Sequence, residues 1–356
     1  MNLDKLISAL PENIDGVLID SAENRFYFTG FPSSAGLLFA AKQGSVFITD
    51  SRYIEAAENK IDCCEVIEQK KPEIQLPEIA AKLGCKTLAV EAKRITIARA
   101  RKLAKNLNGI RIIDDDTADN LIDELRVKKN AEEIARIKKA QAIAERAFDY
   151  ILGFIKKGVT EREIALALDY FMLKNGADAL SFETIVASGV NSSMPHAVPS
   201  DKIIADGDFI TMDFGAIVEG YHSDMTRTVA IGAVSEKQGL VYGTVLAAQL
   251  ASLQSLAPGI TCKAADAAAR DIISNAGFGG NFGHGTGHGV GIEIHEEPTL
   301  SPAGEKTLEA GHVVTVEPGI YLPGEFGVRI EDMAVITTDG CENLTGSTKE
   351  LIMIDV

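Results

Sequence analysis

Short β-branched runs alternate with amphipathic helical stretches over roughly the first 115 residues of the chain. This alternation predicts a mixed sheet covered by helices, which is an α/β domain. The predicted strands are Gly16–Asp20, Arg25–Thr29, Ser45–Thr49, Thr87–Val90 and Ile110–Ile113. The predicted helices lie near residues 51–60, 76–84 and 95–107. All six histidines fall between His196 and His312, so we expect the chemistry to lie in the second half.

A polar helical segment from Ala118 to about Val127 separates the two halves. Asn130 and Glu133 then form a capping-box pattern ahead of a long amphipathic run, and Thr160 and Glu163 repeat the pattern before a helix that we expect Gly176 to close. Beyond residue 181 strands and turns dominate, with helices near 235–257 and 263–276. The sequence therefore predicts two domains, residues 1–124 and 125–356, and an α+β class for the whole chain.

Composition narrows the classes of partner. The chain of 356 residues has a formal charge of −16, so it repels phosphate backbones and anionic lipids, and we expect neither nucleic-acid nor membrane binding. The first residues do not form a signal-peptide pattern, and no apolar run approaches the roughly 18 residues that a membrane helix needs. The five cysteines are odd in number and lack zinc-type spacing. These features predict a cytoplasmic protein with reduced thiols.

Two pairs of acidic residues are each centred on a turn sequence. Asp213 and Asp224 flank the turn at residues 218–220, and Gly324 lies midway between Glu317 and Glu331. If each pair belongs to a β-hairpin, its carboxylates are opposite or diagonal neighbours on one face. Ionised carboxylates that close would repel one another unless a cation lay between them.

A histidine-rich glycine run, Gly279 to His295, lies between the two pairs. Alternate glycines remove side-chain bulk, so backbone and histidine can approach a crowded site closely. The run lacks the lysine of a phosphate-binding loop and the glycine spacing of a dinucleotide site. His288 and the four carboxylates instead predict a site for two divalent ions, with Mn²⁺ preferred and Co²⁺, Zn²⁺ or Fe²⁺ as alternatives. Two metals roughly 3.5 to 4 Å apart share a hydroxide and polarise a carbonyl, which indicates acyl hydrolysis.

The same residues resemble a known family in their order and context. These contexts are Thr-Met-Asp213-Phe-Gly, Ser-Asp224-Met-Thr-Arg-Thr, Gly-Thr-Gly-His288-Gly-Val-Gly, Val-Glu317-Pro-Gly and Val-Arg329-Ile-Glu331-Asp. The set is similar to the pita-bread metallopeptidases of family M24, in their aminopeptidase P and prolidase branch. The segments that end in Met-Pro-His196 and Ile-His295 resemble the accessory histidines of that branch, and Thr49-Asp-Ser-Arg-Tyr53 resembles the creatinase-type N-terminal domain.

The resemblance implies a role for each residue. Asp213 would chelate one metal, His288 and Glu317 the other, and Asp224 and Glu331 would bridge both. Glu317 would also shuttle a proton to the leaving nitrogen. His295 would stabilise the oxyanion or position the scissile carbonyl, and His196 would contact the leaving side. Arg329 shares a strand face with Glu331 and would fix a metal-bound carboxylate or a substrate group.

The resemblance predicts a dinuclear Xaa-Pro aminopeptidase, acting on proline-containing peptides as a homodimer, with prolidase as the second choice on the same site. A creatinase-like, metal-free hydrolase is disfavoured because that branch has lost the metal carboxylates that stand here. A non-catalytic binding protein is disfavoured by the intact ligand set. Of the other histidines, we expect His284 to line the pocket, with either a supporting role behind the ligands or no role. We expect a scaffold role for His222 and surface placement for His312.

Overall fold

A computed structural model describes residues 2–355 of the chain. The structure divides into two compact units between Arg126 and Val127, and each unit is described by itself. Within residues 2–355, none of the helices is long and apolar enough to cross a membrane. All five cysteines carry free thiols, as the sequence predicts.

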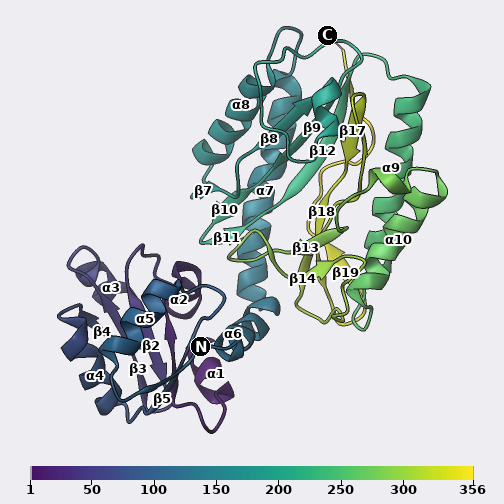
Figure 1. Ribbon diagram of the computed structural model, residues 1–356. Helices are drawn as coiled ribbons and strands as arrows, with labels where there is room; N and C mark the ends of the chain where they lie inside the picture. Colours follow the sequence, from purple (N-terminus) through teal and green to yellow (C-terminus); the bar gives the residue numbers. More distant parts are fainter. Residues whose placement is uncertain (1, 356) are drawn as a thin grey trace. The chain divides into compact units, whose positions relative to one another are not determined.

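The first unit is built around a six-stranded sheet with the order β4-β3-β2-β1-β5-β6 (Figure 1). Its strands are β1 (Gly16–Ile19), β2 (Leu37–Ala41), β3 (Gly44–Thr49), β4 (Glu65–Glu68), β5 (Thr87–Val90) and β6 (Arg111–Ile113). Its helices are α1 (Asn2–Ala9), α2 (Ala22–Thr29), α3 (Ile54–Lys60), α4 (Pro72–Lys82), α5 (Ile97–Asn106) and α6 (Thr117–Val127). Strands β1 and β2 are buried along their whole length, which explains their unbroken apolar sequences.

The predicted strand at residues 25–29 is wrong, because this segment belongs to helix α2. Ser21 caps the helix by accepting a hydrogen bond from the backbone N–H of Asn24, and Gly30 ends it with a left-handed φ of 67°. These caps outweigh the strand preference of the aromatic residues between them. Strands β2 and β4 were not predicted; β4 carries exposed glutamates at both ends and has little apolar signal.

The second unit combines long helices with several small sheets (Figure 1). Its helices are α7 (Ala131–Phe154), α8 (Glu161–Lys174), η1 (Gly189–Ser193), α9 (Glu236–Ser255), α10 (Cys262–Asn275) and η2 (Gly279–Asn281). Its strands are β7 (Ala179–Leu180), β8 (Ile185–Ser188), β9 (Phe209–Phe214), β10 (Ala216–Val218), β11 (Tyr221–His222), β12 (Met225–Ile231), β13 (Gly287–Gly289), β14 (Glu296–Leu300), β15 (Val313–Val316), β16 (Gly319–Leu322), β17 (Phe326–Arg329), β18 (Asp332–Ile336), β19 (Cys341–Asn343) and β20 (Met353–Ile354). The main sheets have the orders β20-β12-β9-β8 and β14-β13-β15-β18-β19.

The capping boxes predicted for the two long helices are confirmed. Asn130 and Glu133 bond reciprocally at the start of α7, and Thr160 and Glu163 do so at the start of α8. Both helices pack on one face of the β9 sheet, where Ile210, Met212 and Phe214 join their core. The opposite face, which includes Phe209, is covered by a second core that contains residues of α9 and α10.

The hairpins predicted from the two acidic pairs are present. Strands β10 and β11 meet at a two-residue turn in which Glu219 and Gly220 both have positive φ, and β9 pairs with β12 in the same register. Strands β16 and β17 pair about Gly324, and β15 and β18 continue that register. The symmetry of the sequence about residues 218–220 and about Gly324 therefore corresponds to real strand pairs. In each case the hairpin and the strand pair beyond it have the same register.

Candidate metal centre

The first acidic pair lies on one face of the β9–β12 pair. Asp213 is directly opposite Thr226, and Asp224 stands two residues before Thr226, where the chain passes from β11 to β12. Side chains alternate along β9, so Asp213 points away from the core that Met212 and Phe214 enter. Asp213 and Asp224 are thus diagonal neighbours, because residues two apart on a strand share a face.

The second acidic pair lies just outside the regular strands. Glu317 follows β15 directly, and Glu331 falls between β17 and β18. Val316 pairs with Asp332 and Gly319 with Arg329, so the register between these pairs places Glu317 across from Glu331. Glu317 is still held from both sides, because its N–H donates to the carbonyl of Thr286 at 2.7 Å and Thr315 Oγ1 donates to its Oε1 at 3.4 Å.

Strand β13 carries His288 between two glycines that allow close packing. A Cβ on Gly287 would lie 2.0 Å from the carbonyl oxygen of Thr315, and one on Gly289 would lie 2.2 Å from that of Glu297. Both positions are therefore restricted to glycine by contact with backbone on either side. The predicted reason for alternate glycines, close approach of the histidine strand to its neighbours, agrees with these distances.

These elements bring the acidic residues and His288 into one cluster. Among residues 2–355, Asp224, His288 and Glu331 form a group whose ligand atoms all lie within 4.8 Å of one another. His288 Nε2 lies 3.6 Å from Asp224 Oδ2 and 3.4 Å from Glu317 Oε1. Asp213 is close enough to raise the pKa of Asp224, Glu317 and Glu331 through its charge. All five predicted ligands therefore face one region.

Burial and mutual repulsion shift the pKa values of this cluster. Burial, and then the charge of Glu331, raise the pKa of Asp224 well above its usual value. Burial, and then the charge of Glu317, do the same for Glu331. Burial raises the pKa of Glu317 to about 8, and burial lowers the pKa of His288. The positively charged side chains nearby do not neutralise all of these carboxylates. This excess of negative charge favours the binding of cations.

The cluster fits divalent cations by the chemistry of its donors. Asp213 Oδ1 is buried and has no hydrogen-bond partner among the described residues, although its Oδ2 accepts a bond from Arg329. A buried acceptor without a donor is an expected position for a cation. The donor set of carboxylate oxygens with one imidazole suits first-row divalent metals and lacks the thiolates of structural zinc sites.

Arg329 is a buried anchor within the cluster. Its Nη2 donates to Asp213 Oδ2 at 2.6 Å, its Nε to Thr226 Oγ1 at 3.1 Å and its Nη1 to the Tyr321 hydroxyl at 2.9 Å. Thr226 Oγ1 in turn donates to Glu331 Oε2 at 2.7 Å. Arg329 therefore fixes the carboxylate of Asp213 directly and that of Glu331 through Thr226.

The two accessory histidines are exposed beside the cluster. The ring of His295 lies 4.4 Å from that of His288, centroid to centroid, at an angle of 62°. His196 lies on the segment after η1, and its charge contributes to lowering the pKa of His295, after burial and His288. Arg329 also reaches this segment, since its Nη1 lies 3.4 Å from the carbonyl of Pro195. Both histidines are thus solvent-exposed next to the cluster.

Some contributors were not predicted from the sequence. Thr226 and Tyr321 hold the charged groups in place, but a strand threonine and a strand tyrosine carry no distinctive signal of their own. His284 Nε2 lies 3.0 Å from the Tyr321 hydroxyl, which gives it the supporting position that was one of its two predicted alternatives. His222 Nδ1 bonds Ser181 Oγ at 2.9 Å, in keeping with a scaffold role.

The surface placement predicted for His312 is wrong. Its side chain is buried, with only 4% of the residue exposed, and its Nδ1 accepts a hydrogen bond from the Glu309 N–H at 3.2 Å. The residue precedes a fully buried strand, β15, so the chain has already entered the core at this point. A polar residue next to a strand end carries no signal that distinguishes these two situations.

Comparison with known proteins identifies the class to which this fold and site belong. The model of metallopeptidase family M24 matches residues 135–338, and that of the creatinase/prolidase N-terminal domain matches residues 3–128. The chain is 41% identical to the structure of an Xaa-Pro dipeptidase from Bacillus anthracis, with a TM-score of 0.95 and 99% of each chain covered. It is 38% identical to an Xaa-Pro dipeptidase of Pyrococcus horikoshii, covering 98% of this chain and 97% of the relative.

A third relative carries a different activity in its name. The structure of an X-Pro aminopeptidase from Thermotoga maritima is 38% identical, with a TM-score of 0.91, and covers 99% of this chain and 100% of that chain. The chain belongs to metallopeptidase family M24. Within the family it falls in the branch of Xaa-Pro dipeptidases and aminopeptidases, which are metallo-exopeptidases. The predicted resemblance, fold class and enzyme class are confirmed.

Proposed function

We propose that the protein hydrolyses the bond between an N-terminal residue and a following proline, with two divalent cations held by Asp213, Asp224, His288, Glu317 and Glu331. The observation that carries the proposal is the buried acidic cluster, with Asp224, His288 and Glu331 within 4.8 Å of one another and the unpartnered Oδ1 of Asp213 beside them. Divalent cations bound there would polarise a scissile carbonyl and lower the pKa of the attacking water.

The residues around the cluster supply the remaining steps. Glu317 is the proton carrier, because it lies in the cluster, with its Oε1 3.4 Å from His288 Nε2, and a carboxylate there can accept a proton from the attacking water. It takes a proton from the attacking water and gives it to the departing proline nitrogen, which has no N–H of its own. His295 donates to the oxyanion as it forms, and His196 contacts the leaving side. Arg329 holds Asp213 in place throughout.

Two substrate classes compete on this site. The sequence favoured longer peptides with proline second, as for aminopeptidase P. Relatives aligned over nearly the whole chain carry the dipeptidase name, including the one with a TM-score of 0.95, which supports Xaa-Pro dipeptides as the principal substrate. We therefore propose an Xaa-Pro dipeptidase that uses Mn²⁺. The aminopeptidase remains the second candidate, supported by the structure from Thermotoga maritima.

One assay separates these functions. Purified protein is stripped with EDTA, reloaded with Mn²⁺ or Co²⁺, and given Ala-Pro and Ala-Pro-Ala in parallel. We expect proline release from the dipeptide only after reloading, and little release of alanine from the tripeptide. Turnover of the tripeptide at a comparable kcat/KM identifies the aminopeptidase instead. Equal turnover with and without EDTA contradicts the metal-dependent mechanism.

The variant Glu317→Gln tests the proton carrier. We expect kcat to fall by roughly 10²- to 10⁴-fold, because the amide cannot accept and return a proton. Metal content measured on the same sample separates this loss from loss of the cations. An unchanged kcat at full metal content contradicts the role of Glu317.

A further inference from the structure

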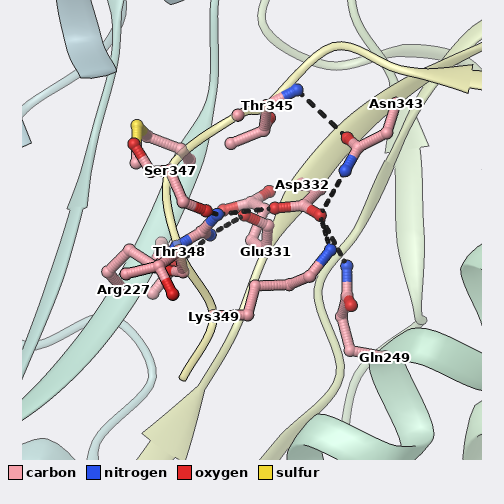
Figure 2. Close-up of polar contacts among 12 residues, drawn as sticks. Arg227, Gln249, Glu331, Asp332, Asn343, Thr345, Ser347, Thr348 and Lys349 are labelled. Atoms are coloured by element: carbon pink, nitrogen blue, oxygen red, sulfur yellow. Dashed lines mark hydrogen bonds and ion pairs between the residues drawn. The ribbon is translucent and has the colours of Figure 1, made fainter. Parts of the chain in front are cut away.

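Arg227, on strand β12, is among the largest fully buried side chains of the protein. Its guanidinium has five N–H donors, and all of them are used. Nε donates to the carbonyl of Thr348 at 2.8 Å, and Nη2 donates to the carbonyl of Ser347 at 2.7 Å and to Asp332 Oδ1 at 2.8 Å (Figure 2). Nη1 donates to the carbonyls of Thr226 at 2.9 Å and Glu331 at 2.6 Å. Four of the five acceptors are backbone carbonyls, so Arg227 mainly holds backbone in place.

One of these backbone positions is that of Glu331, a proposed ligand of both cations. Glu331 lies between β17 and β18, outside the strand ladders. Its N–H donates to the carbonyl of Thr226 at 3.1 Å, and its own carbonyl accepts from Arg227. Its side-chain Oε2 accepts from Thr226 Oγ1. Both backbone groups of Glu331 and one carboxylate oxygen are therefore fixed by Thr226 and Arg227, two consecutive residues.

Asp332 holds the guanidinium in this orientation. Its Oδ1 accepts from Arg227, and its Oδ2 accepts from Gln249, Asn343 and Lys349 (Figure 2). Arg227 and Asp332 are 1% and 0% exposed at their side chains. The pair also fastens the segment Ser347–Lys349, near the end of the chain, against β12 and β18. A planar fork with five donors spans these positions at once, whereas an ammonium group presents three donors at one point.

We propose that Arg227, oriented by Asp332, is a positioning residue that sets the placement of Glu331 for metal binding. This inference rests on the proposed function only in taking Glu331 as a metal ligand. Arg227 touches neither the carboxylate of Glu331 nor, having only donors, a cation. It acts through the Glu331 peptide, and loosening that peptide moves the carboxylate relative to Asp224 and His288.

The test uses Arg227→Lys in the full chain, which keeps the positive charge and loses the fork. Its matched control is Arg25→Lys in the first unit, where a buried arginine also donates to two backbone carbonyls, those of Asp20 and Ser33. Mn²⁺ binding to EDTA-stripped protein is followed by equilibrium dialysis. Electron paramagnetic resonance of the same samples reports whether two Mn²⁺ ions occupy adjacent positions.

We expect Arg227→Lys to weaken at least one of the two Mn²⁺ affinities by roughly 10- to 100-fold and to reduce the spin-coupled Mn²⁺ signal. Arg25→Lys should retain both affinities and the signal, even if its unfolding midpoint falls as far. Unchanged Mn²⁺ affinities in Arg227→Lys, with or without a loss of stability, overturn the proposal and leave Arg227 a purely structural residue.

A second variant covers the case in which Arg227→Lys does not fold. Asp332→Asn keeps an oxygen acceptor for Arg227 but removes the charge that orients it, and we expect a smaller weakening of Mn²⁺ binding. Wild-type affinities in Asp332→Asn then overturn the proposal. The readout is independent of peptide cleavage: wild-type protein that binds two Mn²⁺ but cleaves no Xaa-Pro peptide contradicts the proposed function alone.

Discussion

Single residues in this protein differ in function according to what surrounds them, and the histidines show it. His288 faces two carboxylates, His284 faces the Tyr321 hydroxyl, and His312 is enclosed by the core with its Nδ1 accepting a backbone N–H. Burial lowers the pKa of all three, to about 4 for His284 and His312. Residue type alone therefore does not separate a ligand from a support or a core residue.

The buried His312 predicts a pH dependence of stability. Its folded pKa of about 4 lies below the ordinary value of 6.5, so between these values the unfolded chain binds a proton that the folded chain does not. Stability is then lost as pH falls from 6.5 to 4. We expect His312→Asn to remove this loss. Between pH 7 and pH 4, the unfolding free energy of the variant should fall by roughly 1–3 kcal/mol less than that of the wild type.

Urea unfolding of EDTA-treated protein at a series of pH values measures this difference. The comparison of wild type with His312→Asn cancels the titration of the acidic cluster, because the cluster is common to both. Parallel curves of unfolding free energy against pH would show that His312 titrates normally in the folded protein.

At the scale of elements, the cluster depends on strand pairs whose register is exact over long stretches. The β9–β12 pair and the β15–β18 pair each continue toward a turn. Asp213 lies within the β9–β12 ladder, whereas Asp224, Glu317 and Glu331 lie just outside the regular strands. The glycine strand β13 must fit between β14 and β15, so its backbone spacing controls where His288 lies.

This arrangement predicts a contrast between two glycine substitutions. Gly287→Ala places a methyl group 2.0 Å from the Thr315 carbonyl oxygen, whereas Gly283→Ala finds no atom within 4 Å. We expect Gly287→Ala to cost about 1–3 kcal/mol or more of stability and to weaken metal binding by displacing His288. Gly283→Ala should be nearly neutral in both. Thermal unfolding and Mn²⁺ titration of the two variants provide the measurement, and equal behaviour of both would contradict the account.

The sequence predicted elements well where the signal was local. Capping boxes at Asn130 and Thr160 and the turn at Gly324 depend on a few adjacent residues, and the structure has all three. The prediction for α2 was wrong because its aromatic residues are typical of a strand. Its two caps, Ser21 and Gly30, stabilise the helix instead. The acidic pairs were found because hairpin symmetry links sequence distance to spatial distance. The supports Thr226 and Tyr321 were missed because their partners come from other strands.

At the scale of the whole molecule, all the predicted metal ligands lie in one of the two units. The first unit, through Arg126, contains no histidine and none of the predicted ligands, whereas the second holds the whole cluster. The net charge of −16 attracts cations to the chain, and this attraction is strongest where the buried carboxylates cluster. The homodimer stays an expectation from the family resemblance, and the cytoplasmic location stays a prediction from the sequence.

Binding of cations should therefore stabilise one unit selectively. A ligand that binds only the folded state at 100 times its Kd adds about 2.7 kcal/mol. We expect this gain in the second unit, where β12 and β18 converge on the cluster, and not in β1 or β5 of the first unit. Hydrogen exchange followed by mass spectrometry, with EDTA or with Mn²⁺, reports both units in one experiment. Slower exchange should appear in peptides that contain Met225–Ile231 and Asp332–Ile336.

The control for this experiment is Asp224→Asn, which removes the charge of a predicted bridging ligand and leaves the first unit untouched. In this variant we expect Mn²⁺ to slow exchange much less at β12 and β18, because the metal binds more weakly. Equal protection of both units by Mn²⁺ would mean that the ions bind elsewhere or that the units unfold together. Protection of β12 and β18 that persists in Asp224→Asn would exclude Asp224 as a ligand, because an amide in place of a ligating carboxylate would lower the affinity for a divalent cation.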